Sequence, residues 1–250
     1  STDNPISITN ALGIAAAENT ARLDLDGNGT IGGNVNLATG TLDKLSNFYK
    51  VKVAEQYLYI VDTPISKTTA VVDIAASVLK SNATDPWAPE EAYSGFTVIK
   101  SGSANTTTWD IYARKVTAGI TTVTQFSFDN DRKLKSGFAD GKVLSAQELG
   151  AIEKSSGINL NGDAILGATV ESVDVAGGLY KGSLLNQDFY IVAPSTLALK
   201  TGTTKATATD LSGALLDAND AWELSSTQSI KSLVQTKNGS GAVIGADVYV

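Results

Sequence analysis

Two copies of one ten-residue segment organise this chain: residues 23–32 read LDLDGNGTIG and residues 158–167 read INLNGDAILG. The copies lie 135 residues apart. The same spacing separates three further pairs of identical residues, namely Glu18 and Glu153, Asp85 and Asp220, and Trp87 and Trp222. A slightly shorter spacing separates Tyr49-Lys50 from Tyr180-Lys181. Spacing kept over most of the chain indicates a duplicated unit. We therefore predict two modules of one fold, residues 1–141 and residues 142–250.

A short helix is expected before each repeated segment. Residues 5–21 are rich in alanine, with Asn10 as a cap. Ser145 followed three residues later by Glu148, ahead of Leu149, is the capping-box pattern that starts a helix. Residues 73–80 are expected to form one more short helix. The order of helix and then loop is thus predicted for both modules.

After each repeated segment the hydrophobic period changes to two, and β-branched and aromatic residues dominate, which is typical of strands. The connections are too short for crossover helices, so antiparallel pairing is expected. The predicted fold is mainly β with a minor α part, each module being a short helix, a loop and an antiparallel meander. The expected strands cover residues 48–53, 57–61, 96–99, 109–113, 123–128, 179–180, 189–192, 230–235 and 243–250.

The composition restricts the chemistry that the chain can perform. It has no cysteine, methionine or histidine, which excludes disulfides, thiol nucleophiles, imidazole bases and the usual zinc and copper ligands. The formal net charge of −7 makes nucleic acid and anionic membranes poor partners. The sequence shows no apolar run long enough to span a bilayer, so no membrane insertion is expected. Abundant Thr, Ser, Asn and Gly without cysteine favour a secreted bacterial surface protein, and a start at Ser1 favours a processed protein or a piece of one.

The first repeated segment matches an EF-hand calcium loop. Such a loop has side-chain oxygens at positions one, three and five, a residue that tolerates positive φ at six, a main-chain carbonyl at seven and an apolar residue at eight. Every one of these positions is filled correctly when the loop is counted from Asp24. Position twelve is Val35, which offers no side-chain oxygen, so Glu18 on the preceding helix is the candidate for the missing carboxylate. The predicted calcium ligands of module one are Asp24, Asp26, Asn28, Thr30 and Glu18.

The second segment keeps this pattern less well. Asn159 replaces the first aspartate, and Ala164 replaces the glycine at position six, where a Cβ makes the left-handed conformation cost about 1 kcal/mol. Asp163 alone is anionic within this loop. We therefore expect a weak or empty site in module two, whose apolar residues still pack. Its candidate ligands are Asn159, Asn161, Asp163, Ile165 and Glu153.

A helix, this loop and strands bearing tyrosine and tryptophan together resemble the tryptophan-rich repeat domain of secreted haemolysin-type calcium-binding proteins of bacteria. The loop also resembles that of dockerins. The resemblance covers nearly all of both modules, and it implies an extracellular, tandemly arrayed module of a large surface or type I-secreted protein without implying an activity. The chain departs from the family pattern in having fewer tryptophans and no glycine-rich nonapeptide calcium repeats.

Three classes of function are compatible with these features. The expected one is a non-enzymatic structural or assembly module of a surface layer, fibre or adhesin, stiffened by calcium and associating with itself or with neighbouring modules. Module two ends shortly after Tyr249, the counterpart of Tyr112, and so lacks the last strands of module one. We expect the stretch before Ile14 or a neighbouring chain to complete that sheet.

The other two classes concern glycans. In a carbohydrate-binding adhesive module, Trp87, Trp109 and Trp222 would stack on sugar rings, although a tryptophan at the same place in two repeats favours core packing. A glycan-processing enzyme needs a pair of carboxylates, for which Glu90, Glu91 and Glu223 are available. Ser225 stands opposite Glu90 in the repeat, and adjacent acids are usually just solvated. We therefore expect a protein that is not an enzyme.

Overall fold

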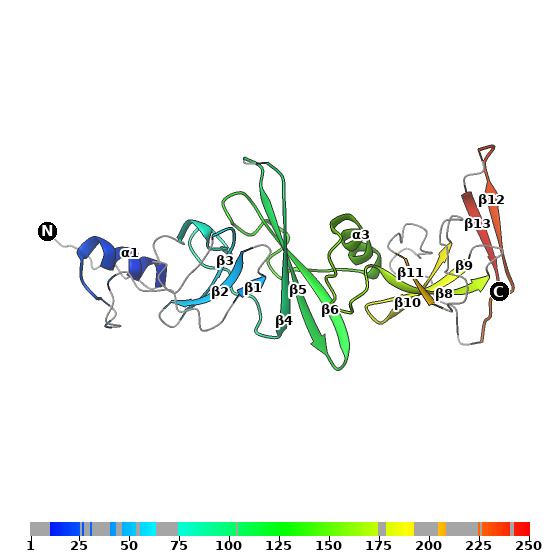
Figure 1. Ribbon diagram of the computed structural model, residues 1–250, viewed down its shortest axis with the longest axis horizontal. Helices are drawn as coiled ribbons and strands as arrows, with labels where there is room; N and C mark the ends of the chain where they lie inside the picture. The colour runs from blue at the N-terminus through cyan, green and yellow to red at the C-terminus, as the bar shows by residue number, and fades with distance from the viewer. Residues whose placement is uncertain are drawn as a thin grey trace. The chain divides into compact units, whose positions relative to one another are not determined.

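The structure is a computed structural model that describes residues 11–25, 27, 31, 41–43, 47–53, 56–63, 75–103, 105–174, 179–192, 205–208, 225, 227–240 and 243–250. Figure 1 labels most of its helices and strands. In chain order they are α1 (Ala11–Ala21), β1 (Thr41–Asp43), β2 (Phe48–Val53), β3 (Gln56–Ile60), η2 (Ala75–Ser77), β4 (Tyr93–Ser101), β5 (Thr108–Thr117), β6 (Ile120–Phe128), β7 (Lys142–Val143), α3 (Ala146–Ser156), β8 (Ala168–Asp174), β9 (Leu179–Leu184), β10 (Gln187–Val192), β11 (Lys205–Ala208), β12 (Ser232–Lys237) and β13 (Val243–Tyr249).

The prediction of a mainly β chain with a minor helical part is confirmed. The described residues form four sheets, in the orders β1-β2-β3, β4-β5-β6-β7, β10-β9-β8-β11 and β12-β13. The strand pairs with a defined register are antiparallel. One sheet departs from a simple meander, because β11 returns to pair with β8 at the edge.

The prediction of a helix over residues 73–80 is wrong for residues 75–80, the part of this range that the structure describes. The chain makes one short 3₁₀ turn, η2, and then continues in extended form. Val78 forms an antiparallel bridge with Ile60, and Lys80 forms one with Pro86. Val78 and Leu79 are fully buried, so burial beside β3 decides the conformation of this segment against its local helical spacing.

The chain divides into two compact units: residues 1–115 with 124–142, and residues 116–123 with 143–250. Unit one has a core rich in aromatic rings. Trp87 lies at its centre, with ring centroids 5.1 Å from Tyr59, 5.0 Å from Phe126 and 5.2 Å from Phe128, all in the edge-to-face arrangement that aromatic pairs prefer. The buried members of this core are Phe48, Tyr59, Val61, Leu79, Trp87, Val98, Trp109, Ile111, Ala113, Phe126 and Phe128.

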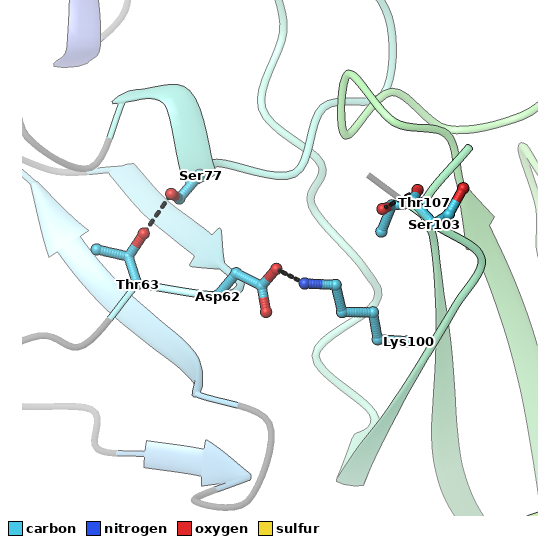
Figure 2. Close-up of polar contacts among 6 residues, drawn as sticks. All are labelled: Asp62, Thr63, Ser77, Lys100, Ser103 and Thr107. Carbon is cyan, nitrogen blue, oxygen red and sulfur yellow. Dashed lines mark hydrogen bonds and ion pairs between the residues drawn. The ribbon is translucent and has the colours of Figure 1, made fainter. Parts of the chain in front are cut away.

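Polar contacts fix the segment that follows β3 in unit one. Figure 2 shows Lys100 of β4 forming an ion pair with Asp62, and Thr63 sharing a hydrogen bond with Ser77 of η2. In the turn before β5, the Thr107 hydroxyl donates to the Ser103 carbonyl at 2.8 Å. The first two contacts link the segment after β3 to η2 and to β4, and the third is local to its turn.

The sheets β1-β2-β3 and β8-β9-β10 have the same register. Tyr49 pairs with Ile60 in the first, and Tyr180 pairs with Ile191 in the second. Both hairpins have the same loop length, since Val53 pairs with Gln56 and Leu184 with Gln187. The neighbouring strand carries an irregularity at the same place, between Thr41 and Asp43 in β1 and between Ser172 and Asp174 in β8. Each residue named in the first sheet corresponds to the residue 131 positions later in the second sheet.

Candidate metal centres

Helix α3 holds Glu153, one of the predicted ligands, above the second loop. The predicted capping box is confirmed, because Ser145 accepts from the Glu148 amide and the Glu148 carboxylate accepts from the Ser145 amide at 3.1 Å. At the other end Gly157 adopts a left-handed φ of 68° and ends the helix. The helix is 11 residues long, and Glu153 lies near its last turn with its side chain fully buried.

The Glu153 carboxylate bridges the two ends of the second loop. Oε1 accepts from the Leu160 amide at 2.8 Å, and Oε2 accepts from the Gly167 amide at 2.7 Å. These positions are the second and ninth of the predicted loop. Hydrogen bonds from two amides to one carboxylate are strong and compensate the cost of burying its charge. Glu153 therefore has a defined role in holding the loop.

Glu18 makes the corresponding contact in the first loop. Helix α1 also has 11 residues and begins and ends 135 positions before α3. Glu18 is fully buried, and its Oε1 accepts from the Leu25 amide at 2.9 Å, again seven residues ahead. Arg22, the residue after α1, has a positive φ of 57° at the position that Gly157 occupies after α3. The glutamate thus reaches the same point of both loops.

The first loop is described in part. Asp24 is exposed, and its Oδ1 accepts from the Gly27 amide at 2.8 Å, as expected for position one of a turn that folds back on itself. Gly27 has a φ of 72°, matching the 78° of Gly162 in the second loop. Asp26, Asn28 and Thr30 lie outside the described residues. The described residues contain no group of three or more acidic side chains placed to hold a metal, and the calcium site of this loop stays a prediction.

The second loop is described completely and closes on itself through side-chain hydrogen bonds. The Gly162 amide donates to Asn159 Oδ1 at 2.6 Å, and Asn159 Nδ2 donates to Asp163 Oδ1 at 2.9 Å and to the Ile165 carbonyl at 2.6 Å. Asn161 Nδ2 donates to Asp163 Oδ2 at 2.9 Å. The four predicted loop ligands of module two are therefore brought together.

Ala164 has a φ of 68°, the left-handed conformation that position six of this loop type demands. The alanine noted in the sequence thus adopts the geometry expected of the glycine it replaces. The Cβ makes this conformation unfavourable by about 1 kcal/mol, which the surrounding hydrogen bonds offset.

The tryptophans in the described part of the chain belong to the core. Trp87 and Trp109 are each 3% exposed, which confirms packing and leaves no face of these rings for a sugar. Trp222 lies outside the described residues, as do Asp220 and Glu223. Arg132 lies over the Trp109 ring, 4.8 Å from its centroid.

Unit one has a cavity of about 220 Å³ that the sequence did not indicate. Glu90 on its rim forms an ion pair with Lys115 at 2.9 Å, which raises the pKa of Lys115. Burial raises the pKa of the Tyr59 hydroxyl, and Lys50 beside it acts in the opposite direction. Two features of the sequence could have indicated this cavity, namely the alternating tyrosines of β3 and the Glu90-Glu91 pair. The cavity is lined mainly by Lys50, Tyr59, Glu90, Glu91, Tyr93 and Phe96.

Comparison of the chain with protein-family models, with curated proteins and with solved structures yields no match. The described part of the chain has no helix long and apolar enough to cross a membrane.

Proposed function

We propose that this chain is a non-enzymatic calcium-binding structural module of an extracellular bacterial surface protein, built from two copies of one unit. The observation that carries the proposal is the pair of buried glutamates. Glu18 and Glu153 come from helices of equal length, and each accepts the amide seven residues ahead, at position two of an EF-hand-like loop. The same helix length and the same glutamate contact in both places support one kind of building block used twice.

The sheets support the duplication independently of the loops. Strands β1-β2-β3 and β8-β9-β10 share strand order, hairpin length, register and the place of one irregularity. A one-residue slip in register would move every side chain to the other face, so agreement over three strands is a strong constraint. This arrangement is consistent with the resemblance of the chain to the repeat domain of secreted calcium-binding proteins.

Calcium is the cation that the first loop suits. Its ligands are oxygens, namely the carboxylates of Asp24 and Asp26, the Asn28 side chain and the Thr30 carbonyl, with water or Glu18 completing the shell. A chain without cysteine or histidine offers no softer donor. Bound calcium stabilises the turn after α1, which stiffens the entry to unit one.

Calcium titration and thermal melting test this proposal. Asp24→Ala removes the predicted ligand at position one, and Asp140→Ala, which changes an exposed acid in the turn before β7, is the matched control for loss of one negative charge. Calcium in hundredfold excess over its Kd stabilises a folded protein by about 2.7 kcal/mol, so the melting temperature of the wild type and of Asp140→Ala should rise on calcium addition. That of Asp24→Ala should not move. Equal midpoints of the wild type in calcium and in chelator contradict the proposal.

Carbohydrate binding is a second candidate, favoured by the cavity of unit one. The rings of Tyr59, Tyr93 and Phe96 line it beside Glu90 and Glu91, and aromatic faces next to carboxylates are what sugar sites use. Titration of the wild type against oligosaccharides tests it, with Glu91→Gln expected to weaken binding and Asp140→Asn to leave it unchanged. No heat of binding for any neutral or acidic oligosaccharide removes this candidate.

A further inference from the structure

The side-chain amide of Asn159 lies among the oxygen atoms that a calcium ion contacts in an EF-hand-type loop. Its Oδ1 accepts from the Gly162 amide at 2.6 Å, and its Nδ2 faces two acceptors, Asp163 Oδ1 at 2.9 Å and the Ile165 carbonyl at 2.6 Å. A donor on one side and two acceptors on the other fix the orientation of the amide unambiguously.

The two acceptors are the ligands of positions five and seven. At position three Asn161 also points its amide inward, with Nδ2 donating to Asp163 Oδ2 at 2.9 Å. Both carboxylate oxygens of Asp163 therefore accept an N–H, and the partially positive amide hydrogens of Asn159 face oxygens that a cation contacts in a metal-bound loop. The oxygens of the loop thus accept hydrogen bonds from its own side-chain and main-chain N–H groups.

The first loop has aspartate at the same position. Asp24 Oδ1 accepts from the Gly27 amide at 2.8 Å, the bond that Asn159 Oδ1 makes with Gly162. An aspartate at position one has no side-chain hydrogen to donate, so it adds a negative charge to the oxygen ligands that the sequence predicts for this loop. A set of such ligands is stable when it binds a cation.

We propose that Asn159 closes the second loop in place of a calcium ion, so that the residue at position one decides which unit of this chain responds to calcium. This inference rests on the proposed calcium-binding function of the first loop. It assigns calcium dependence to unit one and calcium-independent folding of the loop to unit two. Ala164 is no obstacle to a cation, because it already holds the required φ of 68°.

Four proteins test the inference by equilibrium dialysis with calcium: the wild type, Asn159→Asp, Asp24→Asn and the double variant. The expected stoichiometries are about one, two, zero and one ion per chain, because the substitutions exchange the capacity to bind between loops. Asn238→Asp, in the exposed turn between β12 and β13, adds the same charge elsewhere and should keep the wild-type value. A wild type that binds two ions, or an Asn159→Asp variant that gains none while folded, overturns the inference.

The design separates the inference from the proposed function. If the wild type binds no calcium and Asn159→Asp binds one ion, the proposal for the first loop fails and the role of Asn159 stands. Thermal melting covers the case in which Asn159→Asp is unstable, because calcium should restore its melting temperature to that of the wild type. An Asn159→Asp variant that remains unfolded in calcium, or an Asp24→Asn variant that still responds to calcium, also overturns the inference.

Discussion

Glu153 is an acidic residue with a fully buried side chain, and hydrogen bonds from two main-chain amides offset its cost of burial. The substitution Glu153→Gln keeps the shape of the side chain but turns one oxygen into a donor that faces an N–H. We expect it to lower the free energy of unfolding by about 2 kcal/mol, the range found when a buried donor loses its acceptor. Urea unfolding followed by circular dichroism measures this.

The neighbouring Lys154 provides the control, because it is exposed on the same helix turn. Lys154→Gln should change the free energy of unfolding by less than about 0.5 kcal/mol. Glu18→Gln in α1 is the matched variant of the first loop and should be destabilising in the same direction. Equal urea midpoints for Glu153→Gln and Lys154→Gln contradict the role of Glu153 in holding the loop through its two hydrogen bonds.

Ala164 offers a second test at the scale of one residue. Its φ of 68° is unfavourable for a residue with a Cβ, and glycine removes the strain while increasing the freedom of the unfolded chain. Relief of strain outweighs the entropic cost, so we expect Ala164→Gly to raise the free energy of unfolding by about 0.5 kcal/mol. The same substitution at Ala151, exposed in helix α3, should instead cost about 1 kcal/mol. Denaturant midpoints that shift in the same direction for both variants refute this account of the loop.

At the scale of elements, the hairpin β9–β10 carries an ion pair where β2–β3 carries a ring contact. Lys181 Nζ lies 2.8 Å from Asp188 Oδ2, whereas Lys50 Nζ lies 4.4 Å from the centroid of the Tyr57 ring. The hydrogen bond from Lys181 lowers the pKa of Asp188, and partial burial of the carboxyl opposes this. Because the pKa is lower in the folded state, the pair contributes stability above the ordinary pKa of aspartate and loses it as the pH falls through the lowered value.

An NMR titration of the Asp188 carboxyl measures this shift directly. We expect its pKa to lie below the ordinary aspartate value in the wild type and to rise toward that value in Lys181→Gln. The accompanying loss of stability should be small, because both side chains are more than a third exposed and water screens the pair. An Asp188 pKa that is the same in both proteins contradicts the assignment.

The sequence alone was sufficient to predict the elements that have a strong local pattern. The alternation in β2, β3, β5 and β6 and the capping box of α3 are local signals, and the structure agrees with them. Four strands were not predicted, because their pairing depends on a partner strand more than on their own residues. The missed strands are β1, β7, β8 and β11, of which β7 has two residues and β11 has four.

The candidate sites show the same division between local and tertiary information. Asp, Asn and Gly spacing predicted the loop, and Glu18 and Glu153 were singled out by their repeated position. Their partners, the amides of Leu25, Leu160 and Gly167, carry no side-chain signal, because any residue has an amide. The direction of the Asn159 amide also depends on where the loop places Asp163 and Ile165.

At the scale of the whole molecule, the proposed assembly depends on the last hairpin. Among the described residues, β12 and β13 pair with each other alone, and an isolated two-stranded hairpin is marginally stable in water. Val234 is 51% exposed and Tyr249 is 54% exposed, so the hairpin presents apolar side chains beside main-chain groups that another strand can pair with. Because the sequence predicts association of the chain with itself or with neighbouring modules, a second copy of this chain is the partner that we test.

We expect the wild type to form assemblies whose mass, measured by light scattering in calcium, rises with protein concentration. Val234→Lys places a charge on this hairpin and should reduce the average mass to that of a monomer, because a lysine on an exposed strand opposes strand addition. Val116→Lys is the matched control, since Val116 lies in β5 and is 53% exposed, and it should leave the mass distribution as it is in the wild type. Deletion of residues 1–10 distinguishes the donor: a lower mass in that variant identifies the N-terminal stretch as the donated strand, whereas an unchanged assembly assigns the contact to β12 and β13 of two copies. A wild type that stays monomeric at every concentration contradicts assembly by this route, since a head-to-tail contact propagates once it forms.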